Sequence, residues 1–151
     1  MQEFPHHYKV SAQADAQGGV TLSTPGVPSL VSFGPIEFDG PGDHWAPETL
    51  LTGAIADCFV LSFRAIAKAS AFSWERLECQ VEGILERVER VTRFTEFHTR
   101  ATLYVLPGAS VERAQRLLEK AKHACLVSNS LSAQNHLETQ VKVLLTQPQE
   151  P

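Results

Sequence analysis

The stretch that decides the fold is residues 47–70, PETLLTGAIADCFVLSFRAIAKAS. Pro47 suits the first turn of a helix, where a missing amide hydrogen is not needed. Apolar residues then occur on every face of the predicted helix, at Leu50, Leu51, Ile55, Cys58, Phe59, Val60, Leu61, Phe63 and Ile66. A helix that is apolar all round has to be buried all round. The segment is therefore expected to form a long, buried central helix.

Three short strands are expected before this helix. Residues 7–14 alternate between apolar and polar side chains, as a half-buried strand does. Gly18 and Gly19 favour a tight turn into a second strand at residues 20–22, and a third is expected at residues 30–33. Residues 34–47 are rich in glycine and proline and predict a loop. At about 14 residues this loop exceeds ordinary connections, which favours a functional role.

Two strands, a helix and a last strand are expected after the central helix. Residues 74–90 and 93–106 both alternate, and Ser110 suits the N-cap of a second helix that ends near Cys125. A closing strand is expected around residues 137–145, followed by a frayed tail at residues 147–151. The order β-β-β-α-β-β-α-β predicts one α+β domain over residues 1–151.

Composition narrows the classes of protein to consider. A chain of 151 residues can bury a core without disulfides or a structural metal. Its net charge of −4 argues against nucleic acid or an anionic membrane surface as partner. Residues 1–10 show no signal peptide, and Asp57 and Arg64 interrupt the most apolar stretch, so no membrane span is expected. Three cysteines in such a chain favour the reducing cytoplasm.

Each of the three cysteines fits two interpretations. Cys58 lies mid-helix, Cys125 is in phase with the apolar stripe of the second helix, and Cys79 is in phase with its strand. A free cysteine is among the most buried residue types, so each one can be an inert core residue. Nothing near Cys79 in the sequence suggests activation, and we assign it to the core. For Cys58 and Cys125 the residues alone leave core packing and thiol chemistry both open.

Three short segments carry a resemblance to a known family. They are residues 46–51 (APETLL), 56–59 (ADCF) and 124–129 (ACLVSN). They resemble the Pro-Glu-x-Leu helix start, the Ala-Cys-Phe nucleophile segment and the second cysteine segment of the OsmC/Ohr family, the osmotically inducible and organic hydroperoxide resistance proteins. The interval from Glu48 to Cys58 and the order of helices and strands also agree with that family.

The resemblance implies an intertwined homodimer in which two central helices are buried together, with an active site at each end of the interface. It also implies a cysteine-based peroxidase. Cys58 would attack an organic hydroperoxide and become a sulfenic acid, Cys125 would resolve it to a disulfide, and a dithiol reductant would restore both thiols. The implied site residues are Cys58, Cys125 and Glu48. No cofactor and no metal ion are expected, and no Cys or His spacing forms a metal motif.

Glu48 is difficult to place beside Cys58. In one straight helix the ten residues between them span about 15 Å. Glu48 would therefore assist Cys58 either from the partner subunit or through a helix break near Gly53. Alternatively, its carboxylate only interacts favourably with the positive N-terminus of the helix.

The sequence departs from the family pattern in two places. Members that resemble Ohr carry an arginine after the first strand that favours the thiolate, whereas here no arginine precedes Arg64. Leu126 also stands where a proline is expected after the second cysteine. Asp57 beside Cys58 opposes ionisation of a thiol, so a cation has to come from elsewhere. The candidates are Lys9, His44, Arg93, His98 and Arg100.

A second hypothesis is a protein of the same fold that binds an apolar small molecule without thiol turnover. Its pocket would be lined by aromatic and aliphatic side chains in or beside the long loop, namely Phe33, Ile36, Phe38 and Trp45. Thiol loss upon addition of hydroperoxide would distinguish the two hypotheses.

Overall fold

The computed structural model describes residues 1–145, and the chain divides into two compact units. The first is Met1–Leu50, and the second begins at Leu51. A single domain over residues 1–151 stays a prediction. The expected tail at residues 147–151 lies outside the described residues.

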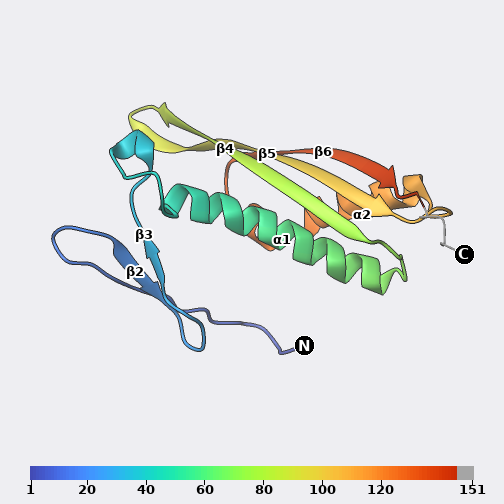
Figure 1. Ribbon diagram of the computed structural model, residues 1–151, viewed down its shortest axis with the longest axis horizontal. Helices are drawn as coiled ribbons and strands as arrows, with labels where there is room; N and C mark the ends of the chain where they lie inside the picture. Colours follow the sequence, from blue (N-terminus) through green and yellow to red (C-terminus); the bar gives the residue numbers. More distant parts are fainter. Residues whose placement is uncertain (146–151) are drawn as a thin grey trace, which may run out of the picture. The chain divides into compact units, whose positions relative to one another are not determined.

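The first unit contains a three-stranded antiparallel sheet. Its strands are β1 (Ser11–Gln13), β2 (Val20–Ser23) and β3 (Leu30–Ser32), in the order β1-β2-β3 (Figure 1). The expected half-buried strand over residues 7–14 is wrong in its extent and burial. Tyr8 and Val10 lie before β1 and are 87% and 67% exposed. Alternation predicts burial only where a second layer covers the strand, and among the described residues of the first unit none covers Tyr8 or Val10.

The predicted loop between β3 and the central helix is compact. It contains the short 3-10 helix η1 (Ile36–Phe38), and the Phe33 amide donates to the Trp45 carbonyl over 2.9 Å. The Gly40 amide donates to Pro35 O over 2.9 Å. A Cβ atom at Gly40 would lie only 1.7 Å from the carbonyl oxygen of Gly34, so the loop can close in this way only with glycine at this position.

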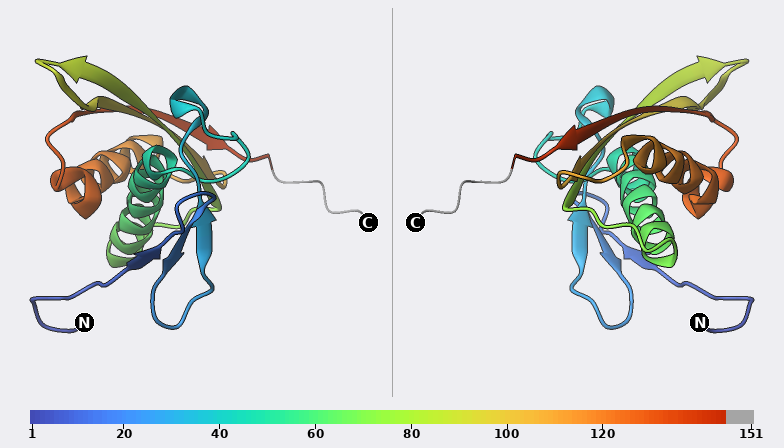
Figure 2. Two further views of the ribbon diagram at one scale, coloured as in Figure 1. Left: turned by 90° about the vertical axis from the view of Figure 1, so that its left-hand side faces the viewer. Right: turned by 90° about the vertical axis from the view of Figure 1, so that its right-hand side faces the viewer.

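The second unit is built on a mixed three-stranded sheet. The central helix α1 (Pro47–Ala69) begins in the last residues of the first unit and is followed by β4 (Arg76–Val88), β5 (Val91–Val105), α2 (Val111–Ala124), the short α3 (Leu126–Asn129) and β6 (Gln134–Val143). Strand β5 is central, antiparallel to β4 and parallel to β6. Helices α1 and α2 cover the same face of this sheet (Figures 1 and 2). The predicted α+β order is confirmed, and η1 and α3 are additions to it.

Helix α1 buries one stripe and leaves its other face open. The buried residues are Ile55, Phe59, Phe63 and Ala67, four residues apart, and the last three pack against β5 and α2. Leu61, on a different face of α1, is 50% exposed. The expectation that α1 is buried all round is therefore wrong for the single chain, because a helix lying on one face of a sheet covers only one stripe.

By length and composition alone, α1 would be able to cross a membrane, with 23 residues and a mean hydropathy of 1.7 in its most apolar window. The sequence predicts no segment that could span a membrane, and by length and composition α1 contradicts that prediction. A single helix of this kind is weak evidence for a membrane span, because the core helix of a soluble protein passes the same test; in the single chain 28% of the window is buried.

Candidate thiol site

Cys58 lies in the middle of α1, between the buried residues Ile55 and Phe59. Its side chain is partly exposed. The Cys58 Sγ atom lies 4.0 Å from the Ser62 hydroxyl oxygen, one helical turn further along. A hydroxyl at this distance is a weak polar neighbour, and the thiol remains open to a small reagent from one side.

Cys125 lies between two helices, one residue beyond the end of α2. Its backbone is extended (φ −66°, ψ 99°), and it serves both as the C-cap of α2 and as the N-cap of α3. The side chain is only 2% exposed. Leu126, in place of the family's proline, is the first residue of α3, so the helix ends at Cys125 without a proline.

The Cys125 sulfur has polar neighbours on two sides. Ser128 Oγ donates a hydrogen bond to Cys125 Sγ over 3.2 Å, and the Ile55 carbonyl oxygen on α1 lies 3.9 Å from the same sulfur. Burial raises the pKa of Cys125, the hydrogen bonds from Ser128 lower it, and the neighbouring Cys58 thiol raises it. Since Ile55 lies one helical turn before Cys58 on α1, the Cys125 sulfur packs against the part of α1 that carries Cys58. The sequence placed the two cysteines on separate helices, and the tertiary structure brings them together.

Cys79 is a third thiol in the same region. It lies on β4 opposite Ala101 and packs against the core between the sheet and the helices. Burial, and to a lesser extent the charge of Cys125, raises the pKa of Cys79 to about 11. Its assignment to the core fits this position. Its proximity to Cys125 was missed from the sequence, because it depends on how α2 packs on the sheet.

The family model for OsmC-like proteins matches residues 40–140, which include α1, both cysteines of the pair and most of β6. The chain belongs to the OsmC/Ohr family. The resemblance noted in the sequence is therefore confirmed. In this OsmC/Ohr protein the matched residues include the first turn of α1 and the Cys125 segment.

The chain is also similar to a curated protein and to solved structures. The chain is 29% identical over 114 residues to the uncharacterized protein YmaD of Bacillus subtilis (strain 168), covering 74% of this chain and 76% of the relative. An OsmC-like protein of unknown function from Vibrio cholerae superposes with a TM-score of 0.80 at 14% identity, covering 89% of this chain and 99% of the other. An organic hydroperoxide resistance protein OsmC from Legionella pneumophila superposes with a TM-score of 0.73 at 24% identity, covering 93% of this chain and 100% of the other. The two structural likenesses show the shared fold.

Glu48 lies in the first turn of α1, where a carboxylate interacts favourably with the helix N-terminus. Helix α1 is continuous through Gly53, so the helix break that would bring Glu48 to Cys58 is absent. Ten residues of unbroken helix separate the two side chains along α1. A role for Glu48 in the chemistry stays a prediction.

Two of the five candidate cations of this OsmC/Ohr protein are directed away from Cys58. Strand β5 alternates, so the side chains of Thr99 and Ala101 are buried beneath the helices while His98 and Arg100 project from the opposite face of the sheet. There Arg100 pairs with Glu138 over 3.4 Å. Because the sheet separates them from α1, His98 and Arg100 do not lie beside the Cys58 of the same chain.

The other three candidate cations for Cys58 are His44, Lys9 and Arg93. The ring of His44 in the first unit lies 2.6 Å from the Asp43 carboxylate, an exposed pair. A role for Lys9 or Arg93 in ionising Cys58 remains a prediction.

The predicted apolar pocket is not formed by the loop residues of the first unit. Ile36, Phe38 and Trp45 are each more than half exposed. Phe33 packs against the His44 ring, with ring centroids 4.4 Å apart. Trp45 lines an open depression of about 420 Å³ with Gly42, Asp43, His44 and Thr49. This surface is mixed in polarity and does not enclose an apolar ligand.

Proposed function

We propose that this OsmC/Ohr protein is a thiol-dependent peroxidase that reduces organic hydroperoxides. The observation that carries the proposal is the packing of a buried thiol, Cys125, against the turn of α1 that carries the partly exposed thiol Cys58, with the Cys125 sulfur 3.9 Å from the Ile55 carbonyl oxygen. A relative of the same fold bears the name organic hydroperoxide resistance protein, which supports the substrate class.

The two thiols have different roles in the proposed reaction. The Cys58 thiolate attacks the distal oxygen of the hydroperoxide, the O–O bond breaks, and the leaving alkoxide takes a proton to become an alcohol. Cys58 is then a sulfenic acid. The Cys125 sulfur attacks the Cys58 sulfur, water leaves and a disulfide forms. A dithiol reductant supplies the two electrons and two protons that restore both thiols.

Burial supports this division of roles. Cys58 is the thiol that a peroxide can reach, because Cys125 is almost completely covered. Burial also raises the pKa of Cys125, which disfavours its thiolate as the first nucleophile. Cytoplasmic reducing conditions suit an enzyme whose resting state has free thiols.

A homodimer is part of the proposal. Leu61 on α1 and Tyr8 and Val10 in the first unit are large, exposed apolar side chains in the single chain. Large apolar side chains that are exposed on each unit favour association, and a second copy of the chain is the partner that an intertwined dimer provides. In that dimer Glu48 acts on Cys58 from the partner subunit, since α1 is unbroken between them.

Thiol titration with stoichiometric cumene hydroperoxide tests the peroxidase. The fully reduced protein contains three thiols, and the expected result is a loss of two per chain, with Cys79 remaining free. Peptide mapping should then find a disulfide between Cys58 and Cys125. Retention of all three thiols would contradict the peroxidase and would support a protein of the same fold without thiol turnover.

A further inference from the structure

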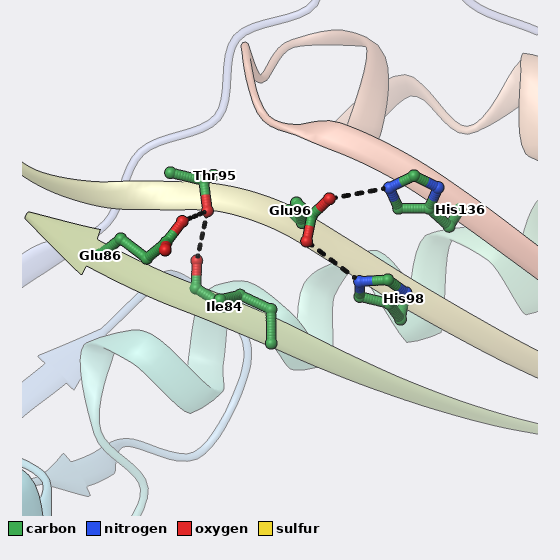
Figure 3. Close-up of polar contacts among 6 residues, drawn as sticks. All are labelled: Ile84, Glu86, Thr95, Glu96, His98 and His136. Atoms are coloured by element: carbon green, nitrogen blue, oxygen red, sulfur yellow. Dashed lines mark hydrogen bonds and ion pairs between the residues drawn. The ribbon is translucent and has the colours of Figure 1, made fainter. Parts of the chain in front are cut away.

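A second polar cluster lies on the face of the sheet that the helices do not cover. Glu96 and His98 are two residues apart on β5, and their side chains therefore project from the same face. In the parallel pairing of β5 with β6, His136 lies directly opposite His98. Figure 3 shows the carboxylate of Glu96 beside the two imidazole rings, with one oxygen directed at each ring.

The distances in this cluster are short. Glu96 Oε2 lies 3.4 Å from His98 Nε2, and Glu96 Oε1 lies 3.2 Å from His136 Nε2. The two rings are stacked, with centroids 4.6 Å apart and an angle of 17° between their planes. One carboxylate oxygen and one ring nitrogen from each histidine all lie within 4.8 Å of one another.

These spacings suit a metal ion. With Zn–N and Zn–O bonds of about 2.0–2.1 Å, two ligands of a tetrahedral Zn²⁺ ion are separated by roughly 3.3 Å. Each Glu96 oxygen lies near that distance from the nitrogen of one histidine, Oε2 from His98 and Oε1 from His136. Two imidazole nitrogens and one carboxylate oxygen are ligands of intermediate softness, and Zn²⁺ binds this combination in proteins.

We propose that Glu96, His98 and His136 form a binding site for a divalent transition-metal ion, with Zn²⁺ as its simplest occupant. Glu96 and His98 are half-buried and His136 is exposed, so a fourth ligand position faces solvent and is open to water. The sheet separates this site from the thiols, since Cys79 and the helices lie on its other face.

Charges around the cluster permit a cation. Arg100, two residues from His98, would repel a metal ion, but Glu138 pairs with it over 3.4 Å. Glu82 lies opposite His98 in the pairing of β4 with β5 and adds a second carboxylate at the edge of the site. Gln80, Glu82, His98 and Arg100 line a small cavity there.

The expectation of no metal ion came from the absence of a local Cys or His motif. His98 and His136 are distant in the sequence, and only the register of β5 and β6 places them side by side. A search for short ligand spacings therefore cannot find this site.

Isothermal titration of the full chain with ZnCl₂ tests the proposal. Because thiolates also bind Zn²⁺, the titration uses both the reduced wild type and the Cys58→Ser/Cys125→Ser variant. One Zn²⁺ per chain is expected in the double variant. Binding should weaken more than about tenfold in His136→Gln and in Glu96→Gln, as loss of a ligand requires. His7→Gln, which removes an exposed histidine outside the cluster, is the matched control and should bind as the wild type does.

Cobalt(II) absorption of the wild type provides the second measurement. Visible d–d bands that are lost in His136→Gln but kept in Cys58→Ser, without a thiolate charge-transfer band, are expected. The proposal is overturned if the double variant binds no Zn²⁺, or if His136→Gln binds Zn²⁺ as tightly as His7→Gln. Because His136 is exposed, its substitution is compatible with folding, and circular dichroism verifies this for each variant.

Discussion

The Cys125 sulfur lies 3.9 Å from the backbone carbonyl oxygen of Ile55, one helical turn before Cys58 on α1. This contact holds the segment between α2 and α3 against the central helix. It is the geometric reason that a thiol from the end of one helix meets a thiol from the middle of another.

Substitution of the two cysteines should have different effects on peroxidase activity. Cys58→Ser is expected to abolish reduction of cumene hydroperoxide, because the proposed nucleophile is lost. Cys125→Ser should still consume one equivalent of hydroperoxide and then stop with Cys58 as a sulfenic acid. Single-turnover kinetics measure the hydroperoxide consumed by each variant, and dimedone trapping with mass spectrometry detects the sulfenic acid. Turnover of Cys58→Ser at the wild-type rate would contradict the mechanism.

Ser128→Ala should make Cys125 a poorer resolving thiol. The Ser128 hydroxyl donates to the Cys125 sulfur and lowers its pKa, so its removal should raise that pKa. Disulfide formation after peroxide addition should slow accordingly. Ser130→Ala is the control, because its hydroxyl donates to the Leu126 carbonyl and not to a thiol. Equal rates in both variants would rule out this role for Ser128.

Cys79 should make stability depend on pH in the alkaline range. Its pKa is raised from 9.0 to about 11 in the folded chain, so the unfolded chain releases the proton first as the pH rises. The resulting contribution to stability is complete below pH 9 and is lost as the pH approaches 11. Urea unfolding from pH 8 to 11 should therefore show a steeper loss for the wild type than for Cys79→Ala. Parallel curves would contradict the raised pKa.

Arg100→Gln should leave the reactivity of Cys58 unchanged, because Arg100 projects from the other face of the sheet and pairs with Glu138. The rate of Cys58 alkylation by iodoacetamide at pH 7 measures this. The same assay on Arg93→Gln and Lys9→Gln tests the remaining basic candidates. A strong decrease in Arg100→Gln would mean that the sheet does not separate it from the thiol.

Leu61→Asp should weaken the proposed homodimer. Burial of one leucine side chain contributes about 1.5–3 kcal/mol, so the loss in both subunits weakens association by more than tenfold. Sedimentation velocity over a range of concentrations measures the change. Gln115→Asp, at an exposed position on α2, adds the same single negative charge and is the control. Wild-type protein that is monomeric at all concentrations would remove the dimer from the proposal.

The sequence predicts the elements of this fold well and their burial less well. The long helix from Pro47, the Ser110 cap and the alternating strands are local patterns, and all three occur in the structure. Serine 110 accepts a hydrogen bond from the Arg113 amide, as a cap should. Burial of Leu61 and Tyr8 was overpredicted, because an apolar pattern shows which face has to be covered but not whether the same chain covers it.

By itself, the sequence determined the order of helices and strands, the family and the identity of the two candidate thiols, since each depends on neighbouring residues or short motifs. The tertiary structure decided what lies beside those residues. It placed Cys125 beside Cys58, and it placed His98 and Arg100 on the far face of the sheet. It also gathered Glu96, His98 and His136 into one cluster. These relationships depend on strand register and helix packing, which join residues that are distant along the chain and leave no local signal in it.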